Sequence, residues 1–523
     1  MAFDFKSVMG TPKNGERRIE NAGYENGKAE SGQIGGSTTK GIDAYESVRN
    51  GFSFTDYAQP GWGQSDGMEK TLLFGEDANH SPIPVHTSRM HPRTKERPVV
   101  IFQNPDGVRF GLTNNMLSRH LLLLGGIGSG KTNAFNFMIE SIQESMTDND
   151  IMFIFDTKGD FYRDFYEKDN PDHILIGNNP AFENETYYWN LFDELREPDG
   201  TFNKNSEITC KEVAKQLFEG RGSDTQPFFE LAAADLVSKV LCHYIRSENS
   251  KFLRPIPLNN YQLVEDLRRA EAQQYDNVVS CHPDFRSARL YYGDPGKPMT
   301  PQALGVFGYI NSMVNDLFVG IFAEKKGKGP FSMRKLVREK GRKIVFIEYD
   351  LSVGEVLAPI YRLLIDLALK EALGRSTKER GNVYFMIDEF KLLPNLMHID
   401  DALNFGRSLG VKVCAGLQSI NQLYDIYGED RGKVLAAGFM NSFCFQTWDQ
   451  ESRKYISQRF GDNYANYTFR VQNNPVCIQR EGQVVEDWDI LNLNVGEAYI
   501  NLTGEKPFKF QFSNFEEPHE ILT

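Results

Sequence analysis

Short runs of consecutive apolar residues recur along this chain, and they predict strands that are buried on both faces. The clearest runs are 121–124, 151–155 and 383–387, which contain almost no polar residue. Uninterrupted apolar strands are typical of parallel sheets covered by helices. Further strands are expected at 174–176, 344–349, 411–417, 442–446 and 497–502. Helical spacing between the runs, as at 133–142 and 357–373, predicts a doubly wound α/β core.

The pattern changes between 205 and 324, where strand-like runs disappear and apolar residues recur every three or four positions. Thr300 followed by Pro301 is typical of a helix start. A second helix is expected over 260–274, with Asn260 as its cap. We therefore expect an all-helical domain inserted into the α/β core.

Composition adds the remaining limits of the organisation. Residues 1–65 are rich in glycine and polar residues, which predicts a flexible N-terminal arm. The nucleotide-binding core is then expected in two parts, 66–204 and 325–523, on either side of the helical insert 205–324. Short apolar runs at 71–74 and 99–102 predict small strands in the first part.

Charge and cysteine content exclude several classes of protein. The six cysteines are scattered and form no C-x-x-C pair, so neither a zinc site nor a disulfide framework is expected. No apolar run approaches the roughly 18–20 residues needed to cross a bilayer, and no signal peptide is expected because the first residues contain no apolar stretch. A cytoplasmic protein is the simplest expectation. The net charge of −13 argues against a generally nucleic-acid-binding surface, though a local basic lining remains compatible with it.

The first apolar run leads directly into a G-x-x-x-x-G-K-T motif, which wraps nucleotide phosphates. Glycines let the backbone fold into a concave nest of N–H groups at a helix N-terminus, where anions are favoured. Lys131 would contact the β- and γ-phosphates, and the Thr132 hydroxyl is the expected Mg²⁺ ligand. The cofactors are therefore ATP and Mg²⁺. The residues of this phosphate loop are Gly125, Gly126, Ile127, Gly128, Ser129, Gly130, Lys131 and Thr132.

A second apolar run ends in two acids, Asp388 and Glu389, as Walker B strands do. Phosphoryl transfer to water requires neutralised phosphate charge and one water held in line. Asp388 would hold Mg²⁺ through water, and Glu389 would orient and polarise the attacking water.

Two residues near the next strand are further candidates. Gln418 stands at the end of the strand, where its amide would sense the γ-phosphate or the attacking water, although a surface glutamine explains the position equally well. Arg407 precedes the same strand and would face the nucleotide of a neighbouring subunit. A surface salt bridge is an equal alternative for Arg407.

Several segments together resemble the type IV secretion coupling proteins, the TraD/TraG-like conjugative DNA pumps of the FtsK–HerA group of RecA-like motors. The resemblance covers roughly residues 100–465, and Thr157 departs from the proline usual in that family's Asp-Pro-Lys-Gly element. It is carried by 387–390, 404–410, 416–428, 156–160, 331–334, 440–441 and 455–457.

The resemblance implies a RecA-like P-loop ATPase that forms a hexameric ring and moves DNA through its channel. It also implies that Arg407 matches the arginine-finger position and Gln418 the sensor position, and that the helical insert helps to recognise cargo. Expected partners are DNA, bound without sequence preference, five further copies of the chain, and secretion-channel or relaxase-type proteins.

Coupling proteins usually begin with membrane-spanning helices, and none is found here. A separate membrane protein would then anchor this one at the cytoplasmic face of the inner membrane. The alternatives are a secretion ATPase or substrate receptor that handles protein cargo, and a HerA/FtsK-like DNA motor without a role in secretion. The most basic segment, 325–343, is a candidate for contacting DNA phosphates, with a solvated helix face as its alternative.

Overall fold

The computed structural model confirms the α/β class. The residues it describes are 69–72, 96–221, 227–269, 271–325, 327–352, 354–376, 381–471 and 474–515. The flexible arm expected over residues 1–65 lies outside this range.

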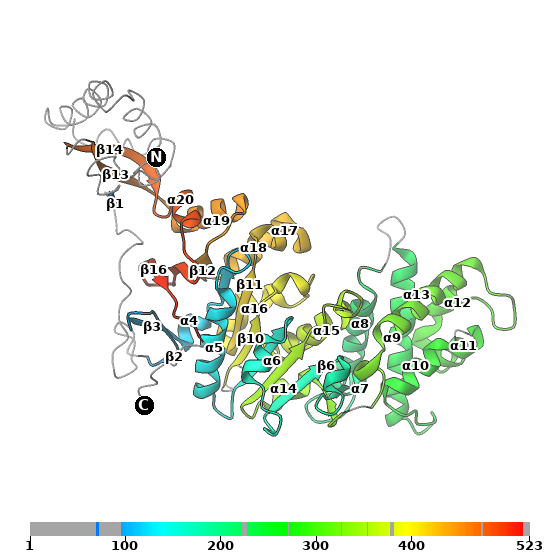
Figure 1. Cartoon of the computed structure of the whole chain (residues 1–523). Coiled ribbons are helices and arrows are strands. Elements are labelled where there is room, and N and C mark those ends of the chain that lie inside the picture. The colour runs from blue at the N-terminus through cyan, green and yellow to red at the C-terminus, as the bar shows by residue number, and fades with distance from the viewer. Residues whose placement is uncertain are drawn as a thin grey trace.

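A nine-stranded sheet forms the centre of the molecule (Figure 1). Seven neighbouring strands run parallel, and two antiparallel strands extend the sheet at one edge. Across the sheet the order is β16 (Phe508–Gln511), β15 (Glu497–Asn501), β12 (Asn441–Phe445), β4 (Leu121–Leu124), β11 (Val411–Leu417), β10 (Val383–Ile387), β5 (Ile151–Asp156), β9 (Lys343–Glu348) and β6 (His173–Gly177). All the strands expected for the sheet are present.

Alternate residues of the central strands pack into two separate cores, because successive side chains of a strand point to opposite faces. Leu121 and Leu123 of β4 pack on the face that is covered by α5 (Lys131–Ser145) and by the hairpin of β2 (Pro98–Gln103) and β3 (Arg109–Thr113). Leu122 and Leu124 pack on the opposite face, which is covered by α15 (Gly354–Leu373). Both faces of the sheet are therefore dry, as the apolar runs predicted.

Helices alone fill the chain between β7 (Tyr188–Trp189) and β8 (Pro330–Phe331) in the part that the structure describes. They lie to the right of the sheet in Figure 1. After the short α7 (Leu191–Glu194), the α-helices of this region are α8 (Lys204–Phe218), α9 (Phe228–Asn249), α10 (Asn260–Arg268), α11 (Ala272–Ser280), α12 (Arg289–Tyr292) and α13 (Pro301–Leu317). The limits 66–204, 205–324 and 325–523 of separate domains stay predictions, since the helices share one apolar core with the nearer sheet face.

Two details of the helical region differ from expectation. The helix expected over 260–274 is divided into α10 and α11. Its cap is Asn259, whose side chain accepts from the Gln262 amide, and not Asn260. The Asn260 side chain is buried and bonds the backbone at the end of β7 and at the start of α7: it donates to the Trp189 carbonyl at 2.9 Å and accepts from the Leu191 amide at 2.9 Å. Of two adjacent asparagines, Asn259 thus caps the helix and Asn260 makes the tertiary contact. Sequence spacing alone does not distinguish the two roles.

A separate three-stranded sheet was not expected in its observed form. It consists of the hairpin β13 (Asp462–Val471) and β14 (Asn474–Gln483) with β1 (Glu69–Leu72) paired antiparallel to β13. Figure 1 shows it projecting from the body of the molecule.

Outside the sheets, the remaining α-helices are α4 (Asn114–Leu117), α6 (Asp160–Phe165), α14 (Met333–Glu339), α16 (Ile399–Phe405), α17 (Ile420–Tyr427), α18 (Glu429–Gly438), α19 (Gln450–Phe460) and α20 (Asp487–Leu491).

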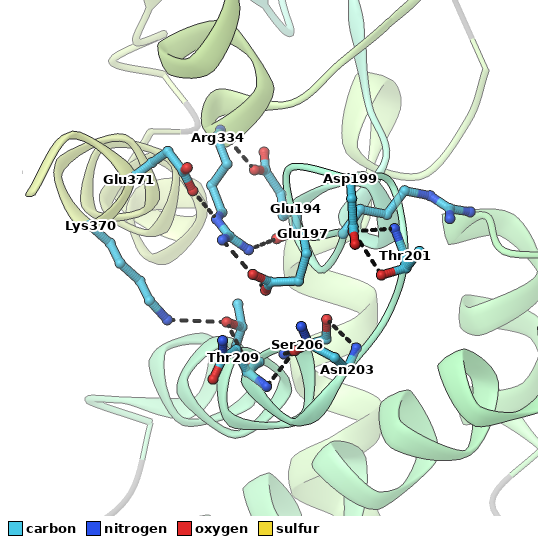
Figure 2. A network of polar contacts seen from close by, with 12 residues as sticks. Glu194, Glu197, Asp199, Thr201, Asn203, Ser206, Thr209, Arg334, Lys370 and Glu371 are labelled. Carbon is cyan, nitrogen blue, oxygen red and sulfur yellow. Dashed lines mark hydrogen bonds and ion pairs between the residues drawn. The ribbon is translucent and has the colours of Figure 1, made fainter. Parts of the chain in front are cut away.

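A buried polar network joins α7, α14 and α15 near the start of the helical region (Figure 2). Glu194, fully enclosed at the end of α7, accepts from the amides of Met333 and Arg334 at the start of α14, at 2.7 and 3.1 Å. The Arg334 guanidinium in turn donates to Glu371 of α15 at 2.7 Å and to the Glu194 carbonyl at 2.7 Å. These contacts fix the core helices from which the helical region departs.

The same network changes the interpretation of the basic segment 325–343. Arg334 is 6% exposed, and Arg338 also donates to Glu371. Lys343 lies 3.1 Å from Glu339, which makes a surface ion pair. Much of the positive charge in this segment is thus neutralised within the chain, which favours its structural interpretation over DNA contact. Among the described residues, no helix combines the length and apolarity needed to span a membrane.

Candidate nucleotide site

The phosphate loop connects β4 to α5, and its shape depends on glycine. Gly128 and Gly130 have φ angles of +73° and +106°, in the left-handed region where a side chain is strained. Gly130 is the N-cap residue of α5. A Cβ on Gly125 would stand 2.5 Å from Cβ of Phe445 in β12. The loop is therefore both tightly curved and tightly packed against the neighbouring strand.

Lys131 is folded back into this loop. Its side-chain amine donates to the carbonyls of Gly125 and Gly126 at 2.7 and 3.0 Å. Burial lowers the pKa of Lys131, and the negative charges of Asp388 and Glu389 oppose that effect. The lysine thus lies against the loop backbone, close to two acids.

Thr132 and Asp388 meet although 256 positions separate them in the sequence: the threonine hydroxyl donates to Oδ2 of the aspartate at 3.1 Å. β4 and β10 both flank β11 in parallel, so their carboxyl ends reach the same edge of the sheet. The topology thereby brings Asp388, which follows the carboxyl end of β10, to the start of α5.

Asp388 and Glu389 are 5% and 6% exposed, and each has one oxygen without a hydrogen-bond partner: Oδ1 and Oε2 respectively. Burial, together with the charge of Glu389, raises the pKa of Asp388 to about 6, while Lys131 and Thr132 act in the opposite direction. Buried carboxylate oxygens without donors are costly unless a cation or water contacts them. The Thr132 hydroxyl and the free Asp388 oxygen fit the ligand preference of Mg²⁺.

No cluster of three or more histidine, cysteine or acidic side chains suited to a metal ion occurs among the described residues. A Mg²⁺ ion usually binds one or two carboxylates and completes its shell with waters and substrate phosphates. The donor set here thus matches a cation that arrives with a nucleotide, and it does not match a permanent metal centre.

Gln418 lies directly beyond β11 and donates from Nε2 to Oε1 of Glu389 at 2.6 Å. This bond fixes the orientation of the carboxylate and leaves Oε2 directed elsewhere. Gln418 is thus linked to the acid expected to hold the attacking water. Its contact with a γ-phosphate stays a prediction.

The structure does not bring Arg407 to this group of residues. Arg407 is exposed in the 3-10 turn η6 (Gly406–Leu409), which precedes the amino end of β11. Its guanidinium donates to Oδ1 of Asn115 at 3.1 Å. The phosphate loop follows the carboxyl end of the adjacent strand β4, so Arg407 lies at the opposite edge of the sheet.

Sequence reasoning gave no role to three neighbours of the site: Lys158, Asp156 and Gly496. Lys158 follows β5, and its charge acts on both Lys131 and Asp388. Asp156 positions that turn by accepting from the amides of Lys158 and Gly159 at 3.0 and 2.9 Å. Gly496, ahead of β15, donates its amide to the Ser129 carbonyl at 2.9 Å. The only sequence signal for it was a glycine between an asparagine-rich turn and a strand.

Curated proteins and solved structures provide the comparison for this geometry. A conjugal transfer protein, "probable" TraG of Sinorhizobium fredii (strain NBRC 101917 / NGR234), is 25% identical over 332 residues, which are 59% of this chain and 50% of that protein. The coupling protein TraD of Escherichia coli (strain K12) is 23% identical over 335 residues, 62% of this chain and 41% of its own. The chain thus spans about half the length, or less, of these relatives.

Among solved structures, the unbound form of the bacterial conjugative coupling protein TrwBdeltaN70 superposes with a TM-score of 0.62 at 18% identity, covering 85% of this chain and 97% of that one. TrwB in complex with ADP and Mg²⁺ gives the same TM-score at 19% identity, covering 87% and 98%. This level of identity shows a shared fold: a RecA-like P-loop core with an all-α region.

The family model described as "Type IV secretion-system coupling protein DNA-binding domain" matches residues 108–508, from β3 to the start of β16. The match includes the phosphate loop, the acidic pair and the whole helical region. The chain therefore belongs to the type IV secretion-system coupling protein family.

Proposed function

We propose that this protein is an ATP-hydrolysing DNA translocase that acts as a coupling protein in conjugation or type IV secretion. One observation carries the enzymatic part: a phosphate loop, a buried lysine and two acids with free oxygens converge at one edge of the sheet. Family membership and the nucleotide complexes of TrwB, which include ADP with Mg²⁺, a GTP analogue and an ATP analogue, support it.

Each residue then has a role in turnover. The nest of amides and Lys131 bind the β- and γ-phosphates. Thr132 and Asp388 would hold Mg²⁺, which neutralises phosphate charge when it is bound with ATP. Glu389, oriented by Gln418 at 2.6 Å, holds the attacking water in line and accepts its proton.

The position of Arg407 supports a role in trans, which a ring of six subunits would provide. Within one chain it lies across the sheet from the phosphate loop, so it can complete only the site of a neighbour. An arginine supplied in trans stabilises the charge of the transition state and links hydrolysis to the subunit interface. Cycles of opening and closing at that interface would drive DNA through the channel towards secretion-channel or relaxase-type partners.

The first test is Lys131→Ala, with Lys454→Ala as a control on an exposed lysine of α19. ATP turnover should be stimulated by DNA in the wild type and in the control, and it should be lost in Lys131→Ala while circular dichroism shows an unchanged fold. Turnover that persists in Lys131→Ala would contradict the site. Turnover that ignores DNA would favour protein cargo.

The second test mixes two inactive variants. Arg407→Ala and Lys131→Ala should each be inactive alone as assembled rings, whereas a mixture should recover part of the activity, because some interfaces then join an intact loop to an intact arginine. Activity that stays absent at every mixing ratio would contradict a role in trans.

A further inference from the structure

We infer that Gly496, in the turn that leads into β15, is a positioning residue of the phosphate loop and thereby sets nucleotide affinity. Gly496 supports the loop from the side of β12 and β15, whereas β10 and its acids approach from the other side. The inference rests on the proposed nucleotide site and deepens it.

The contact is made between two backbones. The Gly496 amide donates to the Ser129 carbonyl at 2.9 Å. A Cβ built on Gly130 would stand 2.8 Å from the Gly496 Cα and 2.9 Å from its nitrogen. Gly496 itself has a φ of +77°. Two glycines, both in the left-handed region, thus face each other at a distance that allows no side chain on the loop.

The turn that carries Gly496 is itself held by the end of β16. The Phe512 amide donates to the Gly496 carbonyl at 2.8 Å. The Gln511 side-chain amide donates to the carbonyls of Val495 and Phe512 at 3.1 and 3.2 Å. The support behind the phosphate loop is therefore the paired end of the β15–β16 hairpin, which is part of the central sheet.

The same hairpin end also contacts the first turn of α5. Asn133, the residue after Thr132, donates from Nδ2 to the Ser513 carbonyl at 2.8 Å, and its Oδ1 accepts from the Phe515 amide at 2.9 Å. One segment thus braces the loop at Ser129 and Gly130 and again at the beginning of the helix. The amides of Gly130, Lys131 and Thr132 lie between these two points.

Bracing of this kind acts on binding more than on chemistry. A nest binds phosphate well when its amides already point at the ligand, because no ordering has to accompany binding. Gly496 touches neither Glu389 nor Gln418 in the structure, and those residues act on the water. Displacing the brace should therefore weaken nucleotide binding and leave the hydrolytic step nearly unchanged.

The experiment compares Gly496→Ala with Gly504→Ala. Gly504 lies in the turn at the other end of the same hairpin, has a φ of +88°, and has open space where a Cβ would be. Both variants carry similar backbone strain, but only in Gly496→Ala does the new Cβ meet a neighbour, Nε2 of Gln511 at 3.0 Å, so only this variant disturbs the turn that braces the loop. Titration of the full chain with ADP and Mg²⁺ should show a Kd about tenfold higher for Gly496→Ala and unchanged for Gly504→Ala. KM for ATP should rise in parallel while kcat stays within about twofold.

Gln511→Ala provides a second route that adds no atoms, and it decides the matter if Gly496→Ala does not fold. It removes the side chain that holds Val495, so a rise of about threefold in Kd is expected with kcat retained. Equal Kd values for the wild type and these variants would overturn the inference, as would an equal rise in Gly504→Ala. Failure of the wild type to bind ADP would instead contradict the proposed function.

Discussion

Two groups of buried acids in this molecule differ in how many hydrogen bonds their surroundings donate to them. Glu194, at the junction in Figure 2, accepts four hydrogen bonds, two on each oxygen, from the Trp189 ring, the Ser332 hydroxyl and the amides of Met333 and Arg334. Asp388 and Glu389 accept one side-chain bond each and leave one oxygen free.

The difference separates structure from chemistry. A buried carboxylate whose oxygens all accept hydrogen bonds from the protein has no capacity for a ligand. Its contribution to the stability of the fold comes from holding its donors in place. A buried carboxylate with a free oxygen is destabilising in isolation, and a cation or a water relieves that cost. The number of hydrogen-bond donors around each buried acid therefore indicates whether the acid stabilises the fold or is available to contact a ligand.

The largest expected effect comes from Glu389→Gln. The glutamine still accepts from Gln418, but it cannot accept a proton from water, so turnover should fall by roughly 10²- to 10⁴-fold. The free energy of unfolding should not decrease, since a buried charge is removed. Rate assays and chemical denaturation check both parts, with the exposed Glu451→Gln as a control. A variant that loses stability along with activity would break the comparison.

Glu194→Ala should have the reverse outcome. It leaves four donors without an acceptor and opens a cavity, so the free energy of unfolding should fall by roughly 3 kcal/mol or more. Glu339→Ala in α14 is a matched control, because surface ion pairs such as Glu339–Lys343 contribute about 1 kcal/mol at most. Urea denaturation measures both, and a loss equal to that of the control would remove Glu194 from the structural group.

Glu348 sharpens the comparison, because it has a free oxygen yet lies at the end of β9, away from the phosphate loop. Burial and the neighbouring Asp156 raise the pKa of Glu348 to about 9. The folded state therefore holds this proton more tightly than the unfolded chain does. The stability from Glu348 is complete below about pH 4.5 and is lost progressively up to about pH 9.

Glu348→Gln cannot lose a proton, so its advantage in stability over the wild type should increase between pH 5 and pH 8, by at most about 1.4 kcal/mol per pH unit. Turnover should stay at the wild-type level. Thermal denaturation at several pH values checks the first expectation. A parallel pH dependence for both proteins would mean that Glu348 is ionised in the fold.

Local patterns explain why so much could be predicted. The sheet strands, the loop 125–132 and the pair Asp388–Glu389 announce themselves within a few residues, because burial on both faces requires apolar runs and a phosphate nest requires glycines. The parallel arrangement then makes it certain that strand ends meet at one edge. The hydrogen bond between Thr132 and Asp388 follows from that topology.

What could not be predicted depends on contacts between distant backbones. The Gly496 amide bonds the backbone carbonyl of Ser129. Any residue at position 129 would offer that carbonyl, so the sequence carries no sign of the contact. The hydrogen bond from Arg407 to Asn115 joins residues 292 positions apart, which spacing does not encode. Asn259 and Asn260 are chemically identical, and only the packing of α10 against β7 decides which of them caps the helix.

The strand order also has a consequence for how the protein forms. β4 ends at Leu124, but its two neighbours, β11 and β12, begin only at Val411 and Asn441. A ribosome must therefore translate most of the chain before this strand acquires either partner, and contacts of such long sequence separation form slowly. During synthesis, the apolar run 121–124 lacks at least one of its two neighbouring strands until Phe445 has emerged. Nascent chains stopped before Val411 should accordingly be bound by chaperones and should not retain ATP.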